Sequence, residues 1–144
     1  MNPIVEKFRR TKDERAVGFI RIFVGMIFLM TGLMKLFVPM AREAWLGQLT
    51  QSGLPFSTIT FWVFPFAEIA TAVILFTGFL TRIGSLVVMG SMISATYVHI
   101  AVHDPTLFPF QPSEPIVPLI VLIMGAFVLW RGGGAWSLDL KTLK

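Results

Sequence analysis

Four long apolar segments constrain this 144-residue chain more than any other feature. They cover about residues 16–38, 58–79, 83–102 and 115–130. Each is close to the ~20 residues that a helix needs to cross the hydrocarbon core of a bilayer. The fourth is short, so we expect it to begin among the headgroups or to thin the bilayer locally. We therefore predict an all-α integral membrane protein, one domain over residues 1–144 with a bundle of four transmembrane helices.

Composition and charge agree with a membrane protein. The chain is 55% hydrophobic and 14% charged, whereas a soluble domain is about 25% charged. The net charge of +4 comes from basic residues crowded near the chain ends, which favours a partnership with anionic lipid headgroups over nucleic acid. The absence of cysteine excludes disulfides and thiolate-ligated iron–sulfur clusters within this chain.

Basic residues fall unevenly on the two sides of the predicted bundle. With four spans, nine lie on the side of both termini, and Arg42 alone lies in a loop on the other side. The nine are Lys7, Arg9, Arg10, Lys12, Arg15, Arg82, Arg131, Lys141 and Lys144. The positive-inside rule then places both termini in the cytoplasm and the loops 39–57 and 103–114 on the opposite side. Near the predicted span ends lie Trp45, Trp62, Trp130 and Trp136, as in an aromatic belt.

Glu68 lies in the middle of the second apolar segment, about 15 Å from the outer surface by helix rise. A carboxylate at that depth costs roughly 2.5–3.5 kcal/mol on insertion scales. It must therefore pair, carry a proton or line a polar cavity. Pro65, three residues earlier, frees a backbone carbonyl, and such kinks often mark a cavity. The alternative is a purely structural hydrogen bond to Thr71, Ser91 or Ser94.

Two basic residues interrupt the first segment, which also carries a glycine at every seventh position. Such a stripe, here Gly18, Gly25 and Gly32, lets helices approach closely. Arg21 and Lys35 each follow a stripe glycine by three residues and so lean towards the bundle interior. For Arg21, near the cytoplasmic end, we favour snorkelling to headgroups. For Lys35 an interior role and snorkelling both stay open.

His99 and His103 are four residues apart and would share one helix face at the outer end of the third segment. The residues His103-Asp104-Pro105 fit a helix end followed by a turn equally well. Two imidazoles need a third ligand to hold a metal, so we predict no metal site, although Asp104 and Glu114 are near in sequence. The pair cannot sandwich a haem, because both side chains point the same way. A hydrogen bond from His99 to a polar ligand is the favoured interpretation.

Depth brings several of these groups together in the outer half of the bundle. Lys35 and His99 lie about 5–6 Å below the outer end by helix rise, above Glu68. We predict that these three border one cavity with apolar walls from Phe28, Phe64 and Met92. The predicted ligand-binding residues are Lys35, Phe64, Glu68, Met92, His99 and His103, with Glu68 and His99 as catalytic residues. Such a cavity suits a quinone or a similar lipid-soluble molecule with polar oxygens, or a proton relay.

Five short motifs resemble the DoxX/DoxD-like family of small four-helix bacterial membrane proteins. They are residues 21–37, with Gly32 and Lys35; Gly53-Leu54-Pro55; Glu68; the turn Gly78-Phe79-Leu80-Thr81-Arg82; and residues 134–139, ending in Ser137-Leu138-Asp139. The resemblance implies a multi-pass protein of the bacterial cytoplasmic (inner) membrane. It also implies a link to thiosulfate:quinone oxidoreduction, detoxification of quinones or aromatic compounds, or oxidative-stress complexes. Thiosulfate oxidation in the family involves a second subunit or domain that this chain lacks.

Three functions compete at this stage. The first is the membrane subunit of a quinone-dependent redox system, not a complete enzyme alone, with quinone as a cofactor and no haem, flavin or iron–sulfur cluster. The second is a small proton-coupled transporter that uses Glu68, and the third is a structural or anchoring subunit of a larger complex. The partners expected are the lipid bilayer and either further copies of the chain or a larger redox complex. The first two predict a cavity that reaches Glu68, whereas the third predicts a closed core.

Overall fold

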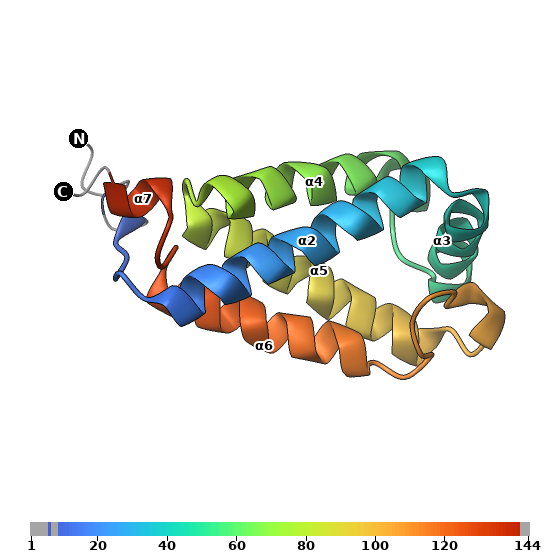
Figure 1. The fold of residues 1–144 in the computed structure, drawn as a ribbon. Helices are drawn as coiled ribbons and strands as arrows, with labels where there is room; N and C mark the ends of the chain where they lie inside the picture. The colour runs from blue at the N-terminus through green and yellow to red at the C-terminus, as the bar shows by residue number, and fades with distance from the viewer. Residues whose placement is uncertain (1–5, 7–8, 142–144) are drawn as a thin grey trace.

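The fold is a four-helix membrane bundle (Figure 1). The computed structural model describes residue 6 and residues 9–141, and in that part of the chain all regular structure is helical. The bundle consists of α2 (Arg15–Phe37), α4 (Ser57–Thr77), α5 (Thr81–Ala101) and α6 (Ile116–Arg131). The first three are long and apolar enough to cross a membrane, and α6 is a shorter apolar helix. All four begin and end within two residues of the segments expected from the sequence.

A fifth helix, α3 (Pro39–Ser52), occupies most of the stretch for which we expected a loop, so that expectation is wrong. Pro39 fits the first turn of a helix, where its missing N–H is not needed. The preceding Val38 is extended, and Gly53 ends the helix in the left-handed conformation. α3 lies across one end of the bundle, and α7 (Leu138–Lys141) lies at the other (Figure 1).

The glycine stripe packs α2 against its neighbours, as its spacing predicted. A side chain at Gly25 would meet Leu75 and Phe76 of α4 at 3.1–3.3 Å. At Gly32 the added carbon would lie 2.9 Å from the Pro65 carbonyl oxygen. The close approach of α2 to α4 therefore depends on the absence of side chains at these positions. Between these helices and their neighbours lies a core of Val24, Phe28, Ala72, Leu75, Val88 and Val121.

Arg21 is fully buried, so the snorkelling expected for it is wrong. Its guanidinium donates hydrogen bonds to the carbonyl oxygens of Leu75 (2.6 Å) and Phe76 (3.4 Å) at the end of α4. A third bond, of 3.3 Å, reaches the carbonyl oxygen of Ala135 in the segment after α6. That segment covers the start of α2. The guanidinium therefore bonds to carbonyl oxygens within the protein and does not extend to the lipid headgroups.

The end of the bundle at α7 is tied together by further polar contacts, and we call it the tied end. Asp139 accepts hydrogen bonds from the backbone N–H groups of Leu80 and Thr81, each at 3.0 Å, and from Arg9 at 3.1 Å. Arg131 forms a two-pronged ion pair with Glu14. Arg9, Glu14, Arg82, Arg131 and Asp139 thus gather at this end, whereas Arg42 lies in α3 at the other. That grouping matches the charge pattern of the sequence, and the side of the membrane it faces stays a prediction.

Candidate ligand-binding site

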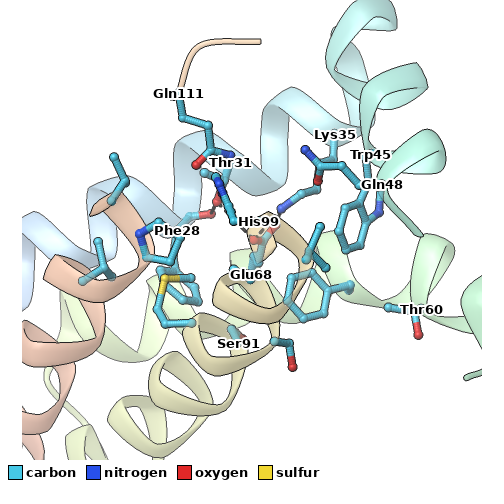
Figure 2. A pocket seen from close by; sticks show the side chains of 18 of the residues that line it. Phe28, Thr31, Lys35, Trp45, Gln48, Thr60, Glu68, Ser91, His99 and Gln111 are labelled. Carbon is cyan, nitrogen blue, oxygen red and sulfur yellow. Dashed lines mark hydrogen bonds and ion pairs between the residues drawn. The ribbon is translucent and has the colours of Figure 1, made fainter. Parts of the chain in front are cut away.

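A cavity of about 230 Å³ lies at the α3 end of the bundle (Figure 2). All four bundle helices, α3 and the connecting loops contribute to its wall. The lining includes every residue that we predicted to share a cavity except His103, namely Phe28, Lys35, Phe64, Glu68, Met92 and His99. The structure therefore brings these side chains to one place, in the half of the bundle predicted to face outwards.

A buried ion pair forms the polar centre of the cavity. The ammonium nitrogen of Lys35 lies 2.6 and 2.7 Å from the two carboxylate oxygens of Glu68. The Glu68 side chain is 4% exposed and that of Lys35 is 16% exposed. The Thr31 hydroxyl also lies 3.2 Å from Oε1 of Glu68, the carboxylate oxygen that is 2.6 Å from Lys35. The expectation that Glu68 turns inwards and pairs with a basic or hydroxyl group is confirmed, with Lys35 and Thr31 in place of the hydroxyls of α4 and α5.

Local sequence explains why the pair forms here. Gly32 allows α2 to lie close to α4, since an added side-chain carbon at this position would lie only 3.3 Å from the Cβ atom of Glu68. Thr31 and Lys35 are one turn apart on α2, so both face the carboxylate. Pro65 lies inside α4 and is one turn from Glu68. It lacks the N–H that would bond to the preceding turn of α4, and its carbonyl oxygen lies against Gly32 of α2.

Two aromatic rings flank the ammonium group of Lys35. Its nitrogen lies 4.9 Å from the ring centre of Trp45 and 5.2 Å from that of Phe64. Both distances are within the range of cation–π attraction. Trp45 was expected in the aromatic belt, but it is only 8% exposed and lies in the wall of the cavity. The belt interpretation of Trp45 is therefore wrong, because residues 39–52 form the helix α3, and Trp45 lies on the face of that helix that packs on the bundle.

The indole N–H of Trp45 is buried and has no hydrogen-bond partner among the described residues. Buried donors are almost always paired, and an unpaired one costs about 1–3 kcal/mol. An acceptor atom on a bound molecule would remove that cost. Trp45, a residue of the cavity wall, therefore carries a buried donor that is not used within the described residues.

His99 contributes a base of defined orientation. It is 7% exposed, and its Nδ1 atom lies 3.1 Å from the carbonyl oxygen of Ser113. A carbonyl oxygen only accepts hydrogen bonds, so Nδ1 carries a proton in this contact. In the neutral ring Nε2 is then an acceptor. The ring also packs on Phe108, with 4.4 Å between ring centres.

His103 does not join His99, and the expected shared face is wrong. α5 ends at Ala101, and Val102 is extended, so the spacing of four residues no longer describes a helix turn. His103 is exposed and lines no part of the cavity. Asp104 instead caps the short helix η1 (Pro105–Leu107). Its hydrogen bonds with the hydroxyl and N–H of Thr106 hold the pKa of Asp104 below its ordinary value.

Within the described residues no three His, Asp or Glu side chains lie close enough to hold a metal ion. The polar groups of the lining are instead an ammonium, a carboxylate, an imidazole, four hydroxyl groups and two side-chain amides, set among apolar walls. This combination can donate hydrogen bonds to carbonyl oxygens and accept them from hydroxyl groups.

The sequence did not single out Thr31, Trp45, Gln48 or Gln111 as cavity residues. Trp45 and Gln48 belong to α3, and a signal for that helix was present. Pro39 begins a stretch of good helix formers, and Ala41, Trp45 and Gln48 recur at helical spacing. Gln111 belongs to the loop before α6 and carried no comparable signal.

The fold and the cavity define a small helical membrane protein with an ion pair in a cavity of ligand size. The family model described as DoxX matches residues 16–104, well over half of the chain, and the protein belongs to the DoxX family. The match includes Lys35, Glu68 and His99. A similar protein is the uncharacterized membrane protein Rv3486 of Mycobacterium tuberculosis. It is 26% identical over 138 residues, which cover 87% of this chain and 80% of that protein. No solved structure matches the chain.

Proposed function

We propose that this protein binds a quinone, or a similar lipid-soluble molecule with ring oxygens, as the membrane subunit of a redox system. The observation that carries the proposal is the Lys35–Glu68 ion pair, buried in the wall of an otherwise largely apolar cavity. A pair placed only for packing would be enclosed by protein atoms. This one borders open space.

The residues divide into donors and acceptors around a ring. Lys35 and Trp45 donate hydrogen bonds to a ring oxygen, and Phe28, Phe64 and Met92 hold the apolar faces of the ring. His99 accepts a hydrogen bond from a ring hydroxyl through Nε2. Glu68 fixes the ammonium group of Lys35 and is the second proton carrier in the site.

Reduction of a quinone to a quinol takes up two electrons and two protons. In this proposal His99 and the Lys35–Glu68 pair move the protons, and a partner redox protein supplies the electrons. The chain is then one component of a larger complex, in the bacterial inner membrane with both termini in the cytoplasm. The basic residues at the tied end support that orientation.

Binding of a tailless benzoquinone to the purified protein in detergent tests the proposal. Glu68→Gln keeps the shape and removes the charge that holds Lys35, so affinity should fall about tenfold or more, equivalent to about 1.4 kcal/mol. Glu43→Gln is the matched control, because Glu43 is exposed on α3 and lies outside the cavity. Equal affinity of the wild type and Glu68→Gln would overturn the assignment.

A proton-coupled transporter is the second candidate. The direct ion pair supports it, because a proton on Glu68 would release Lys35 and open the site to a substrate. This function predicts substrate-driven proton movement into liposomes that contain only this protein. The quinone proposal predicts none without an electron donor. A purely structural subunit predicts a closed core, and the cavity beside Glu68 argues against it.

A further inference from the structure

A second cavity, of about 400 Å³, adjoins the first. It lies between α2, α3 and the segment that leads into α6. Seven residues line both cavities, including Thr31, Lys35, Trp45 and Gln48. The ion-paired lysine therefore stands at the boundary between the two spaces. We call the first the polar chamber and the second the side chamber.

The two chambers differ in chemistry. The residues that line only the polar chamber include Glu68, His99, Thr60 and Ser91. Those that line only the side chamber are all apolar, namely Phe23, Met26, Met30, Met34 and Phe110, together with two alanines and one proline. Apart from the residues that both chambers share, polar side chains line only the polar chamber, which is the pattern that a molecule with a polar head and an apolar chain would match.

The side chamber faces the surrounding lipid. Met26 is 53% exposed and Met30 is 58% exposed, and both project from a membrane-spanning helix. At the tied end the start of α2 is fixed to the end of α6 by the Glu14–Arg131 pair. At the opposite end the side chamber separates α2 from Val117 in the first turn of α6. The chamber therefore opens sideways, where an aliphatic chain would pass into the hydrocarbon.

Methionine is a suitable lining for such an opening. Its side chain is unbranched and flexible, so it adapts to an apolar chain of variable course. Three methionines, Met26, Met30 and Met34, follow one another at four-residue spacing along the side chamber. They form a continuous flexible strip on α2 that ends beside Lys35.

We propose that the ligand of this protein carries a long apolar chain and reaches its site sideways from the bilayer. Its polar head lies in the polar chamber beside Lys35, Glu68 and His99, and its chain follows the methionine strip through the side chamber. This inference rests on the proposed function and specifies it further. It assigns the protein to isoprenoid- or alkyl-chain quinones and sets it apart from proteins that bind small water-soluble aromatic compounds.

A pair of probes and a pair of variants test the inference. The probes are a tailless benzoquinone and the same ring with a decyl chain, measured in the same detergent. Met30→Trp fills the side chamber without touching the polar chamber. Met40→Trp is the control, since Met40 is similarly exposed, at 53%, but lies outside both chambers. Met30→Trp should weaken binding of the decyl quinone about tenfold and leave the tailless quinone unchanged, and Met40→Trp should change neither.

The outcomes separate the two proposals. If both probes bind and Met30→Trp alters neither affinity, the chain does not use the side chamber and this inference is overturned while the proposed function stands. If Met30→Trp and Met40→Trp weaken the decyl quinone equally, the effect belongs to the general apolar surface and the inference is again wrong. If the wild type binds neither probe, the proposed function fails and this inference fails with it.

Discussion

The two ends of the bundle each hold a basic residue of α2 that turns inwards, and the two residues have different surroundings. At the tied end Arg21 is enclosed, with carbonyl oxygens of α4 and of the segment after α6 as its partners. At the α3 end Lys35 is paired with Glu68 beside a cavity. Both residues follow a stripe glycine by three positions. The same sequence pattern therefore yields a structural tie where a chain segment covers it and an ion pair beside a cavity where space is left.

Packing around the two charges shows the same contrast. A side chain at Gly78 would overlap both the Arg21 guanidinium and Ser137, so the space around Arg21 is filled by protein atoms. The ammonium group of Lys35 instead meets the faces of two aromatic rings and the open space of the polar chamber. We therefore expect stability to depend mainly on the tied end and ligand binding mainly on the other.

Arg21→Met should show the largest effect on stability. It leaves three buried carbonyl oxygens without a charged donor, and we expect a loss of about 3–5 kcal/mol. Thermal unfolding followed by circular dichroism in detergent measures it. Arg21→Lys keeps the charge but not the planar, several-donor geometry of the guanidinium, so its loss of stability should be smaller. Ligand affinity of the folded fraction should not change, and a stable Arg21→Met protein that binds no quinone would reverse the roles of the two ends.

Lys35→Met makes the same change at the other end. It leaves the Glu68 carboxylate without its cation, but the polar chamber gives water access to it. The loss of stability should therefore be smaller, about 1–3 kcal/mol, than for a fully enclosed pair. Quinone binding should disappear. The melting curve and the quinone-binding curve of Lys35→Met are compared with those of Arg21→Met. If Lys35→Met is the less stable of the two variants, the two ends do not differ as proposed.

Gly32→Ala tests the close approach that brings Lys35 to Glu68. The added methyl group would lie 2.9 Å from the Pro65 carbonyl oxygen and from Ile69, so α2 must shift away from α4. We expect a loss of about 1–2 kcal/mol and weaker quinone binding. Gly90→Ala, where nothing lies within 4 Å, is the control and should be neutral or stabilising by up to about 1 kcal/mol. Similar behaviour of the two variants would show that the approach at Gly32 is not tight.

Asp104→Asn should have the smallest effect, because Asp104 lies at the α3 end but outside both chambers. Hydrogen bonds with Thr106 lower the pKa of Asp104 in the folded protein. Its contribution to stability is therefore present above the ordinary pKa of about 4 and is lost as pH falls through the folded-state value. The small difference in melting temperature between wild type and variant should vanish in acid. Quinone affinity at neutral pH should be equal in both.

Much of the fold could be predicted from the sequence because bilayer thickness sets the length of each span. The four apolar segments marked the bundle helices closely, and the glycine stripe identified the face of α2 that packs on α4. The helix α3 was not predicted, because it is too polar to be recognised as a membrane span. Residues 39–52 were judged only as a connection between spans.

The site was predictable where a residue is costly in lipid and not elsewhere. Glu68 and Lys35 drew attention through their charge, and His99 through its depth. Trp45 and Gln48 could not be placed because their positions depend on how α3 folds over the bundle. The expectation for Arg21 failed for a similar reason, since its partner Ala135 is 114 residues away in the chain. Contacts between distant segments leave no local pattern in the sequence.

We propose that the Lys35–Glu68 pair serves ligand binding and not the stability of the fold. Quinone affinity of the double variant Lys35→Met/Glu68→Leu tests this most directly. Replacement of a whole buried ion pair by apolar residues is often neutral or stabilising, so the variant should fold with a melting temperature at or above that of the wild type. We predict that this folded protein shows no measurable binding of the tailless benzoquinone. Binding with wild-type affinity would show that the ion pair takes no part in ligand binding.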